Sequence, residues 1–301
     1  MIYTLTLNPA IDYVVQLGDP LRRGSINRSQ WEDYQFGGKG INVSNVLKAL
    51  GQDTVALGFV AGFTGQALEQ GLQRTGLATR FLHLAQGNTR INVKVKETAE
   101  TEINGAGPVI TPEDMARLYD QLNSLCPEDI LVLSGSVPAC LGADTYARIL
   151  ERLQGTGIRT VVDASGPLLT NALPYKPFLV KPNREELEAI AGQPLKEEAQ
   201  LADAARQLQQ KGATHVLVSL AGDGAMLLDG KGCVHRIQCP KGRVRNSVGA
   251  GDSMVAGFLA GFLETGDYAY ALRLGTAAGS ATAFSLGLAT KEEIQMLLEQ
   301  M

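Results

Sequence analysis

Residues 130–134 read Ile-Leu-Val-Leu-Ser, a short and almost continuously apolar run. Segments of helical period separate it from comparable runs on both sides, which lie at residues 2–7, 55–60, 160–163, 178–181 and 215–219. Apolar strands that alternate with helices are typical of a parallel sheet covered on both faces. The sequence therefore predicts an α/β fold with a doubly wound, mainly parallel sheet and helices on both of its faces.

The stretch Thr111-Pro112-Glu113-Asp114 marks the start of one of these helices. It offers an N-cap hydroxyl, a proline at the first helical position and two acids in the first turn, which are the usual signals of a helix N-terminus. We expect a helix to begin here and to bury the apolar residues that follow at 115, 118 and 122.

Two segments, 11–36 and 89–105, interrupt the alternation of strands and helices. In the second, Ile91, Val93 and Val95 alternate with polar residues, as in half-buried antiparallel strands. We interpret the two segments as a small β-sheet lid, which would keep water away from a group-transfer reaction. Because no repeat or linker divides the chain, residues 1–301 are predicted to form a single domain that carries this lid.

The composition argues against nucleic acid and membranes as partners. The 301 residues include 27 basic and 31 acidic side chains, a formal net charge of −4, so no overall positive field would attract nucleic acid or an anionic membrane. The longest apolar runs are too short to span a bilayer, and the first residues resemble a strand rather than a signal peptide. We expect a cytoplasmic protein without nucleic-acid or membrane partners.

The strongest local motif is Gly249-Ala250-Gly251-Asp252, which opens an apolar helix. The glycines let the backbone approach a ligand, and the unpaired N–H groups of a first helical turn bind anions. Asp252 could accept a proton from an attacking hydroxyl while the turn stabilises a phosphoryl group. The motif alone also allows a plain reading, in which Asp252 caps the helix and the glycines form an ordinary turn.

A second glycine cluster, Gly37-Gly38-Lys39-Gly40, precedes Asn42 and another helix. Here the backbone could contact a sugar, Lys39 could offer charge to a phosphate, and Asn42 has both a donor and an acceptor for hydroxyl groups. A glycine-rich turn with a solvated lysine explains the cluster equally well.

Taken together, the two clusters resemble the paired signatures of the ribokinase-like carbohydrate kinases, also called the phosphofructokinase B family. Residues 6–12, 89–94 and 101–104 narrow the resemblance to the branch that contains bacterial 1-phosphofructokinase and tagatose-6-phosphate kinase, and the similarity to the former is greater. The resemblance extends over essentially the whole chain and implies a ribokinase-like fold.

The resemblance also implies roles for individual residues. Asp252 matches the catalytic base of the family, and Gly249, Ala250 and Gly251 match its anion hole. The positions that hold the acceptor sugar are Asp12, Gly38, Lys39 and Asn42. Arg90 falls where the family clamps the phosphate that the sugar already carries, and Arg90 with Lys39 would fix that phosphate.

Nucleotide-binding positions follow from two further stretches. Residues 181–186 resemble the Asn-x-x-Glu motif of the family, in which Lys181 and Asn183 face the nucleotide and Glu186 holds Mg²⁺ through water. The sequence alone also allows Asn183 and Glu186 to form a helix-capping pair. Residues 219–224 resemble a nucleotide loop, and the positions assigned to ATP are Lys181, Asn183, Ser219, Gly222, Gly224 and Gly251.

The reaction implied by resemblance is ATP-dependent phosphorylation of fructose 1-phosphate, or of a related ketohexose phosphate, at the 6-hydroxyl. Tagatose-6-phosphate kinase or 6-phosphofructokinase activity is the first alternative, and a non-catalytic sugar-phosphate sensor is the second. ATP and Mg²⁺ are the expected cofactors. Members of the family often pair through their lids, so a homodimer is expected.

Overall fold

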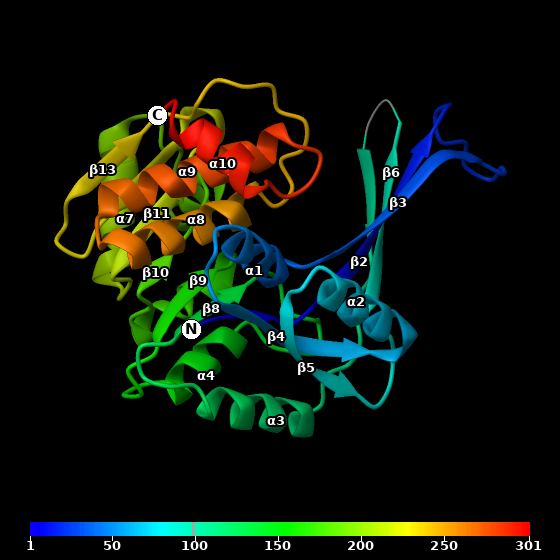
Figure 1. Cartoon of the computed structure of the whole chain (residues 1–301). Helices are drawn as coiled ribbons and strands as arrows, with labels where there is room; N and C mark the ends of the chain where they lie inside the picture. The colour runs from blue at the N-terminus through cyan, green and yellow to red at the C-terminus, as the bar shows by residue number, and fades with distance from the viewer. Residues whose placement is uncertain (98–99) are drawn as a thin grey trace.

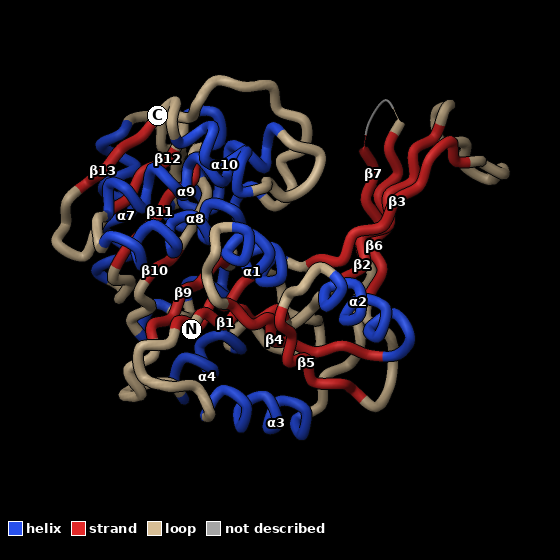
Figure 2. Tube along the Cα trace, in the orientation of Figure 1, coloured by secondary structure: helices blue, strands red, loops and turns tan. Residues whose placement is uncertain are grey.

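The computed structural model describes residues 1–97 and 100–301; residues 98 and 99, inside the predicted lid segment 89–105, lie outside the described residues. The described part contains one sheet of nine strands and one of four (Figures 1 and 2). The nine strands are β1 (Ile2–Thr6), β4 (Thr54–Ala61), β5 (Ala78–Leu84), β8 (Ile130–Ser134), β9 (Arg159–Asp163), β10 (Leu179–Val180), β11 (His215–Ser219), β12 (Ala225–Leu228) and β13 (Val234–Ile237).

The large sheet confirms the predicted doubly wound architecture. Its strand order is β13-β12-β11-β10-β9-β8-β1-β4-β5, and all pairings from β5 to β11 are parallel. Only β12 and β13 pair in antiparallel fashion at one edge. The chain starts in β1 and extends the sheet to both sides of it, so the carboxyl ends of the parallel strands meet at one edge, where open α/β folds bind ligands.

Helices cover both faces of the large sheet, as the apolar strands predict. One face carries α1 (Lys39–Ala49), α8 (Ala250–Thr265), α9 (Tyr268–Phe284) and α10 (Lys291–Leu298). The other carries α3 (Pro112–Asn123), α4 (Thr145–Arg152), α5 (Gly166–Thr170), α6 (Arg184–Ala191) and α7 (Glu198–Gln210), and α2 (Gly62–Arg74) packs near β4 and β5. Within the described ranges, no helix combines the length and apolar character needed to cross a membrane.

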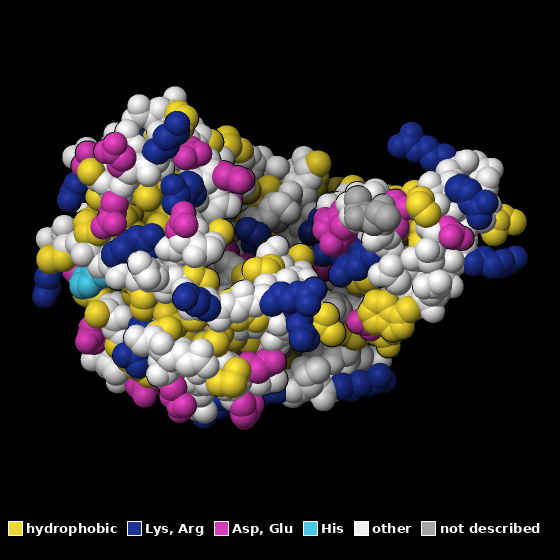
Figure 3. Space-filling model, turned by 90° about the horizontal axis from the view of Figure 1, so that it is seen from above, with side chains coloured by type: hydrophobic (Ala, Val, Ile, Leu, Met, Phe, Trp, Pro, Cys, Tyr) yellow, Lys and Arg dark blue, Asp and Glu magenta, His cyan; other side chains and the backbone are white. Residues whose placement is uncertain are grey.

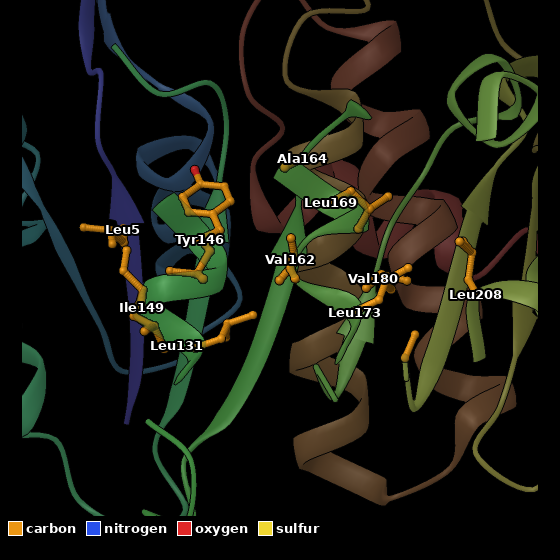
Figure 4. Packing of buried hydrophobic residues seen from close by; sticks show 14 of the residues in the cluster. Leu5, Leu131, Tyr146, Ile149, Val162, Ala164, Leu169, Leu173, Val180 and Leu208 are labelled. Atoms are coloured by element: carbon orange, nitrogen blue, oxygen red, sulfur yellow. The ribbon is translucent and has the colours of Figure 1, made fainter. Parts of the chain in front are cut away.

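The core on the α3 to α7 face is built from side chains of the central strands and of the helices above them (Figure 4). Tyr146 of α4 is fully buried there, and its hydroxyl donates a hydrogen bond to the carbonyl oxygen of Gly135 at 3.0 Å. This bond fixes the loop that follows β8, next to the aliphatic part of Lys39. On the same face, Thr111 caps α3 and forms a capping box with Asp114, which confirms the predicted helix start.

The small sheet occupies the two segments that interrupt the alternation of strands and helices. It consists of β2 (Ala10–Leu17), β3 (Ser29–Gly37), β6 (Arg90–Lys96) and β7 (Glu100–Asn104) in the order β3-β2-β6-β7, and it projects from the main body (Figure 1). The β2–β3 and β6–β7 pairs are antiparallel as expected, but β2 and β6 pair in parallel. Both of these strands leave the same edge of the large sheet and run outward, so parallel pairing follows from the topology.

Candidate active site

A cavity of about 490 Å³ lies between the carboxyl edge of the large sheet and the inner face of the small sheet. Seen from above, the surface is hollowed between the main body and the projecting sheet, and basic side chains show in the hollow (Figure 3). Twelve of the predicted site residues line the cavity: Asp12, Gly38, Lys39, Asn42, Arg90, Lys181, Asn183, Glu186, Ser219, Gly249, Gly251 and Asp252. The structure thus brings together residues that are up to 240 positions apart in the sequence.

Three predicted residues, Ala250, Gly222 and Gly224, are not among those that line the cavity. The N–H of Ala250 donates to the carbonyl oxygen of Ser247 at 3.2 Å, so it is already used within the turn. Gly222 and Gly224 lie in the turn after β11. A side chain at Gly224 would collide with the backbone carbonyl of Ile237, and its φ of 91° favours glycine, so packing explains this residue without a ligand.

Asp252 lies in the first turn of α8, which begins after Gly249 in the left-handed conformation (φ 82°). Its carboxyl is almost fully buried, with 5% of the residue exposed, and Oδ2 accepts a hydrogen bond from Nδ2 of Asn42 at 2.8 Å. Among the hydrogen bonds of the described residues, the backbone N–H groups of Gly251 and Asp252 have no acceptor. The helix N-terminus therefore offers donors to an anion beside a buried carboxylate.

Asp163, at the end of β9, is a buried acid that sequence reasoning did not assign to the site. Its Oδ1 lies 3.1 Å from Nζ of Lys181 and 4.0 Å from Nζ of Lys39, and its Oδ2 accepts a hydrogen bond from the Ser134 hydroxyl at 3.2 Å. The available signal was an acidic residue at the carboxyl end of an apolar strand, the position where open α/β folds build their sites.

The two buried carboxyl groups have different pKa values. Burial, together with the neighbouring charge of Asp163, raises the pKa of Asp252 to about 7, although Asn42 and the two lysines oppose the shift. Burial also raises the pKa of Asp163, but Lys181 and Lys39 outweigh it, so the net pKa lies below the usual value. Pairs of carboxyl groups with separated pKa values are typical of acid–base catalysis. Asp252 is therefore suited to accept a proton near neutral pH.

Asn183 and Glu186 form the capping pair that the sequence allowed. Oδ1 of Asn183 accepts from the N–H of Glu186 at 2.7 Å, and Oε2 of Glu186 accepts from the N–H of Asn183 at 2.9 Å. Both residues nevertheless line the cavity, so the capping role and a ligand role are compatible. No group of three potential metal ligands occurs in the part of the chain that the structure describes. A single carboxylate fits Mg²⁺, which takes one or two carboxylates and completes its shell with water and substrate phosphates.

The small sheet contributes the opposite wall of the cavity. Oδ1 of Asp12 accepts a hydrogen bond from Nδ2 of Asn92 at 2.7 Å, which fixes both side chains across β2 and β6. Arg90 donates through Nε to the carbonyl oxygen of Asn8 at 3.2 Å and through Nη1 to that of Gly105 at 3.5 Å. Within residues 1–97 and 100–301, its Nη2 has no acceptor. Arg90 is thus held in place with donors left over for a ligand.

The same wall includes residues that sequence reasoning missed. They are Asn92, Lys94, Glu102 and Asn104, and all four line the cavity. Their alternation along β6 and β7 was visible in the sequence, but which face turns toward the cavity depends on how the two outward hairpins pair.

Replacing Asp252 by asparagine should change how stability depends on pH. The unfolded Asp252 ionises near pH 4, but the folded residue keeps its proton until about pH 7. Its contribution to stability is therefore lost as the pH rises between these values, and Asp252→Asn removes that loss. The difference in the free energy of unfolding between the variant and the wild type should therefore shift in favour of the variant by roughly 3 kcal/mol from pH 5 to pH 8.

Thermal unfolding of both proteins at the two pH values measures this gain. Asp120→Asn, which changes an exposed carboxylate of α3, is the control and should show no such gain. An equal difference in Tm between Asp252→Asn and wild type at pH 5 and pH 8 would contradict the prediction.

Comparison with known proteins agrees with this geometry. The model of the family described as pfkB family carbohydrate kinase matches residues 2–295. A 1-phosphofructokinase of Bacillus subtilis (strain 168) is 47% identical over 300 residues, which cover 100% of this chain and 98% of the relative. A D-tagatose-1-phosphate kinase of Bacillus licheniformis is 37% identical, with 100% and 98% covered.

A solved structure, described as the tetrameric inhibited form of phosphofructokinase-2 from Escherichia coli, superposes with a TM-score of 0.91 at 29% identity. The match covers 99% of this chain and 98% of that one. The family match and this similarity confirm the predicted ribokinase-like fold and kinase class. The chain belongs to the pfkB family of carbohydrate kinases.

Proposed function

We propose that this kinase transfers the γ-phosphoryl group of MgATP to the 6-hydroxyl of fructose 1-phosphate and yields fructose 1,6-bisphosphate and ADP. The observation that carries the proposal is the buried carboxyl of Asp252, with a pKa raised to about 7, at a helix N-terminus inside a cavity of suitable size. The name of the B. subtilis relative supports the choice of fructose 1-phosphate.

In the proposed reaction, Asp252 accepts the proton of the 6-hydroxyl while the oxygen of that hydroxyl bonds to the γ-phosphorus. The bond between the γ-phosphorus and the bridging oxygen of ADP breaks at the same time. The free N–H groups of Gly251 and Asp252 stabilise the charge on the transferred group, a role that the sequence assigned to Gly249, Ala250 and Gly251. Lys39 and Lys181, which flank Asp163, add positive charge near the transferred phosphoryl group.

On the sugar side, Arg90 would bind the 1-phosphate through its uncommitted donors, since a guanidinium matches a phosphate in geometry. Asp12 and Asn42 would hold the sugar hydroxyls, and Gly38, which lines the cavity, would bring its backbone close to the sugar.

On the nucleotide side, Lys181, Asn183 and Ser219 would face the phosphates of ATP, and Gly222 and Gly224 would shape the turn beside them. Glu186 would hold Mg²⁺ through water, and the metal would neutralise charge on the phosphates. A reaction that consumes ATP also fits the expected cytoplasmic location.

We further propose that residues 11–36 and 89–105 act as a lid within a single domain of residues 1–301. The inner face of this sheet contributes six polar residues to the cavity wall: Asp12, Arg90, Asn92, Lys94, Glu102 and Asn104. Closure of the lid over the sugar would exclude water, which competes with the acceptor for the phosphoryl group.

A coupled assay of ADP release tests the proposed reaction. The panel comprises fructose 1-phosphate, tagatose 1-phosphate, fructose 6-phosphate, tagatose 6-phosphate and free fructose, and fructose 1-phosphate should give the highest kcat/KM. Asp252→Asn should lower kcat by roughly 10²- to 10⁴-fold, because the proton acceptor is lost.

Three outcomes would contradict the proposal. A higher kcat/KM on any other sugar of the panel would change the substrate, and binding of fructose 1-phosphate without ADP release would indicate a sensor rather than an enzyme. Unchanged turnover in Asp252→Asn would remove the assigned base.

We also propose that the chain forms a homodimer through the outer face of the small sheet. Ile103 lies between two cavity-lining residues of β7, so its side chain points to the opposite face, where the register aligns it with Val93, Tyr13 and Tyr34. Ile103 and Tyr34 are 62% and 61% exposed. An exposed apolar face on a small sheet favours association, and the E. coli relative is described as tetrameric.

Sedimentation equilibrium at micromolar concentration should show a dimer for the wild type and a monomer for Ile103→Asp, because a buried charge would disrupt the interface. Val109→Asp serves as the control, since Val109 is 70% exposed but lies outside the small sheet. A monomeric wild type, or a dimer that survives Ile103→Asp, would refute the interface.

A further inference from the structure

Lys94 of β6 is a buried lysine in the wall of the cavity. Only 11% of its side chain is exposed, and its single ionic partner among the described residues is Glu102 of β7, whose side chain is 41% exposed. The distance between Nζ of Lys94 and Oε1 of Glu102 is 3.5 Å, longer than a strong charge-assisted hydrogen bond. A buried ammonium group with one loose and exposed partner is costly for stability, which suggests that it serves a ligand.

The register of the small sheet places Lys94 on the same face as Arg90. Arg90, Asn92 and Lys94 alternate along β6 and all line the cavity, whereas Lys96, the next residue on this face, does not. At about 3.3 Å per residue, the Cα atoms of Arg90 and Lys94 are roughly 13 Å apart. Their long side chains can therefore approach one group that lies above Asn92.

On the wall that the small sheet contributes, Lys94 is a cation that a ligand can recruit, because its carboxylate partner Glu102 is partly exposed. Lys39 and Lys181 both face the buried Asp163 on the catalytic side. Arg90 has donors to spare but is a single positive charge. A sugar phosphate carries nearly two negative charges, and a dianion competes well for an ammonium group against one partly exposed carboxylate.

We propose that Lys94 binds, together with Arg90, the phosphate group that the acceptor sugar already carries. Glu102 holds the Lys94 side chain until that phosphate takes the place of Glu102 as the partner of Lys94. Lys94 is thus a specificity-determining residue that favours phosphorylated sugars over free ones. This inference rests on the proposed function, because it requires a sugar phosphate as the acceptor.

Two substitutions with opposite expected effects test the exchange. Lys94→Met should raise the KM and the Kd for fructose 1-phosphate by about 10- to 100-fold, the usual effect of losing a hydrogen bond to a charged group, and should leave the KM for ATP nearly unchanged. Glu102→Gln should lower the KM and the Kd for fructose 1-phosphate by about two- to fivefold, because it removes the competing carboxylate.

Lys96→Met is the matched control, since it changes a lysine on the same face of β6 that lies outside the cavity wall, and it should leave both constants unchanged. Kinetic assays give the KM, and calorimetric titration with fructose 1-phosphate in the absence of ATP gives the Kd independently of turnover.

If the Lys94–Glu102 pair only stabilises the lid, Lys94→Met and Glu102→Gln should weaken binding in the same direction, and that result would overturn the inference. An unchanged Kd in Lys94→Met would also overturn it while wild-type turnover of fructose 1-phosphate still upheld the proposed function. Failure of the wild type to bind fructose 1-phosphate would remove both.

Discussion

The site depends on how positive charge is divided between two buried carboxyl groups. Asp163 and Asp252 lie at the same edge of the large sheet. Both lysines near them approach within 4.0 Å of Asp163, whereas the side-chain hydrogen bond that Asp252 accepts within the described residues comes from the amide of Asn42. Asp163 is therefore kept ionised, and its charge adds to the burial that raises the pKa of Asp252. This separation leaves one carboxylate to hold the lysines and the other to exchange a proton.

The path of the chain connects this charge arrangement to the sugar side. Strand β3 of the small sheet ends at Gly37, and α1 begins two residues later at Lys39. The helix that holds Asn42 against Asp252 therefore continues directly from the sheet that carries Asp12 and Arg90, the residues proposed to face the sugar. A movement of the small sheet would act on α1 through this short connection, so the proposed lid closure would have a direct physical route to the hydrogen bond between Asn42 and Asp252.

Much of the fold could be predicted from the sequence because its signals are local. Apolar runs such as residues 130–134 define the strands of a parallel sheet, and the capping residues at Thr111 define a helix start. The parallel pairing of β2 with β6 was not predicted, because it depends on the shared edge from which the two hairpins leave.

The sequence predicted those residues of the cavity that belong to recognisable motifs. Asp252 and Asn42 lie in glycine-rich motifs, and the structure places them in contact although 210 residues separate them. Asp163 carries no motif, since only the neighbouring lysines distinguish it from any acid at the end of a strand. Lys94 and Glu102 become a pair only through the register of β6 and β7, which the sequence does not specify.

The most direct test of this arrangement is the pKa of Asp252 itself. Protein labelled with ¹³C at the aspartate carboxyl carbons can be titrated by NMR, and comparison with Asp252→Asn assigns the signal. The arrangement of charges predicts a midpoint near pH 7 for Asp252. A midpoint near pH 4, the value of an ordinary exposed aspartate, would show that the carboxyl is neither desolvated nor affected by Asp163 and would contradict its assignment as the base.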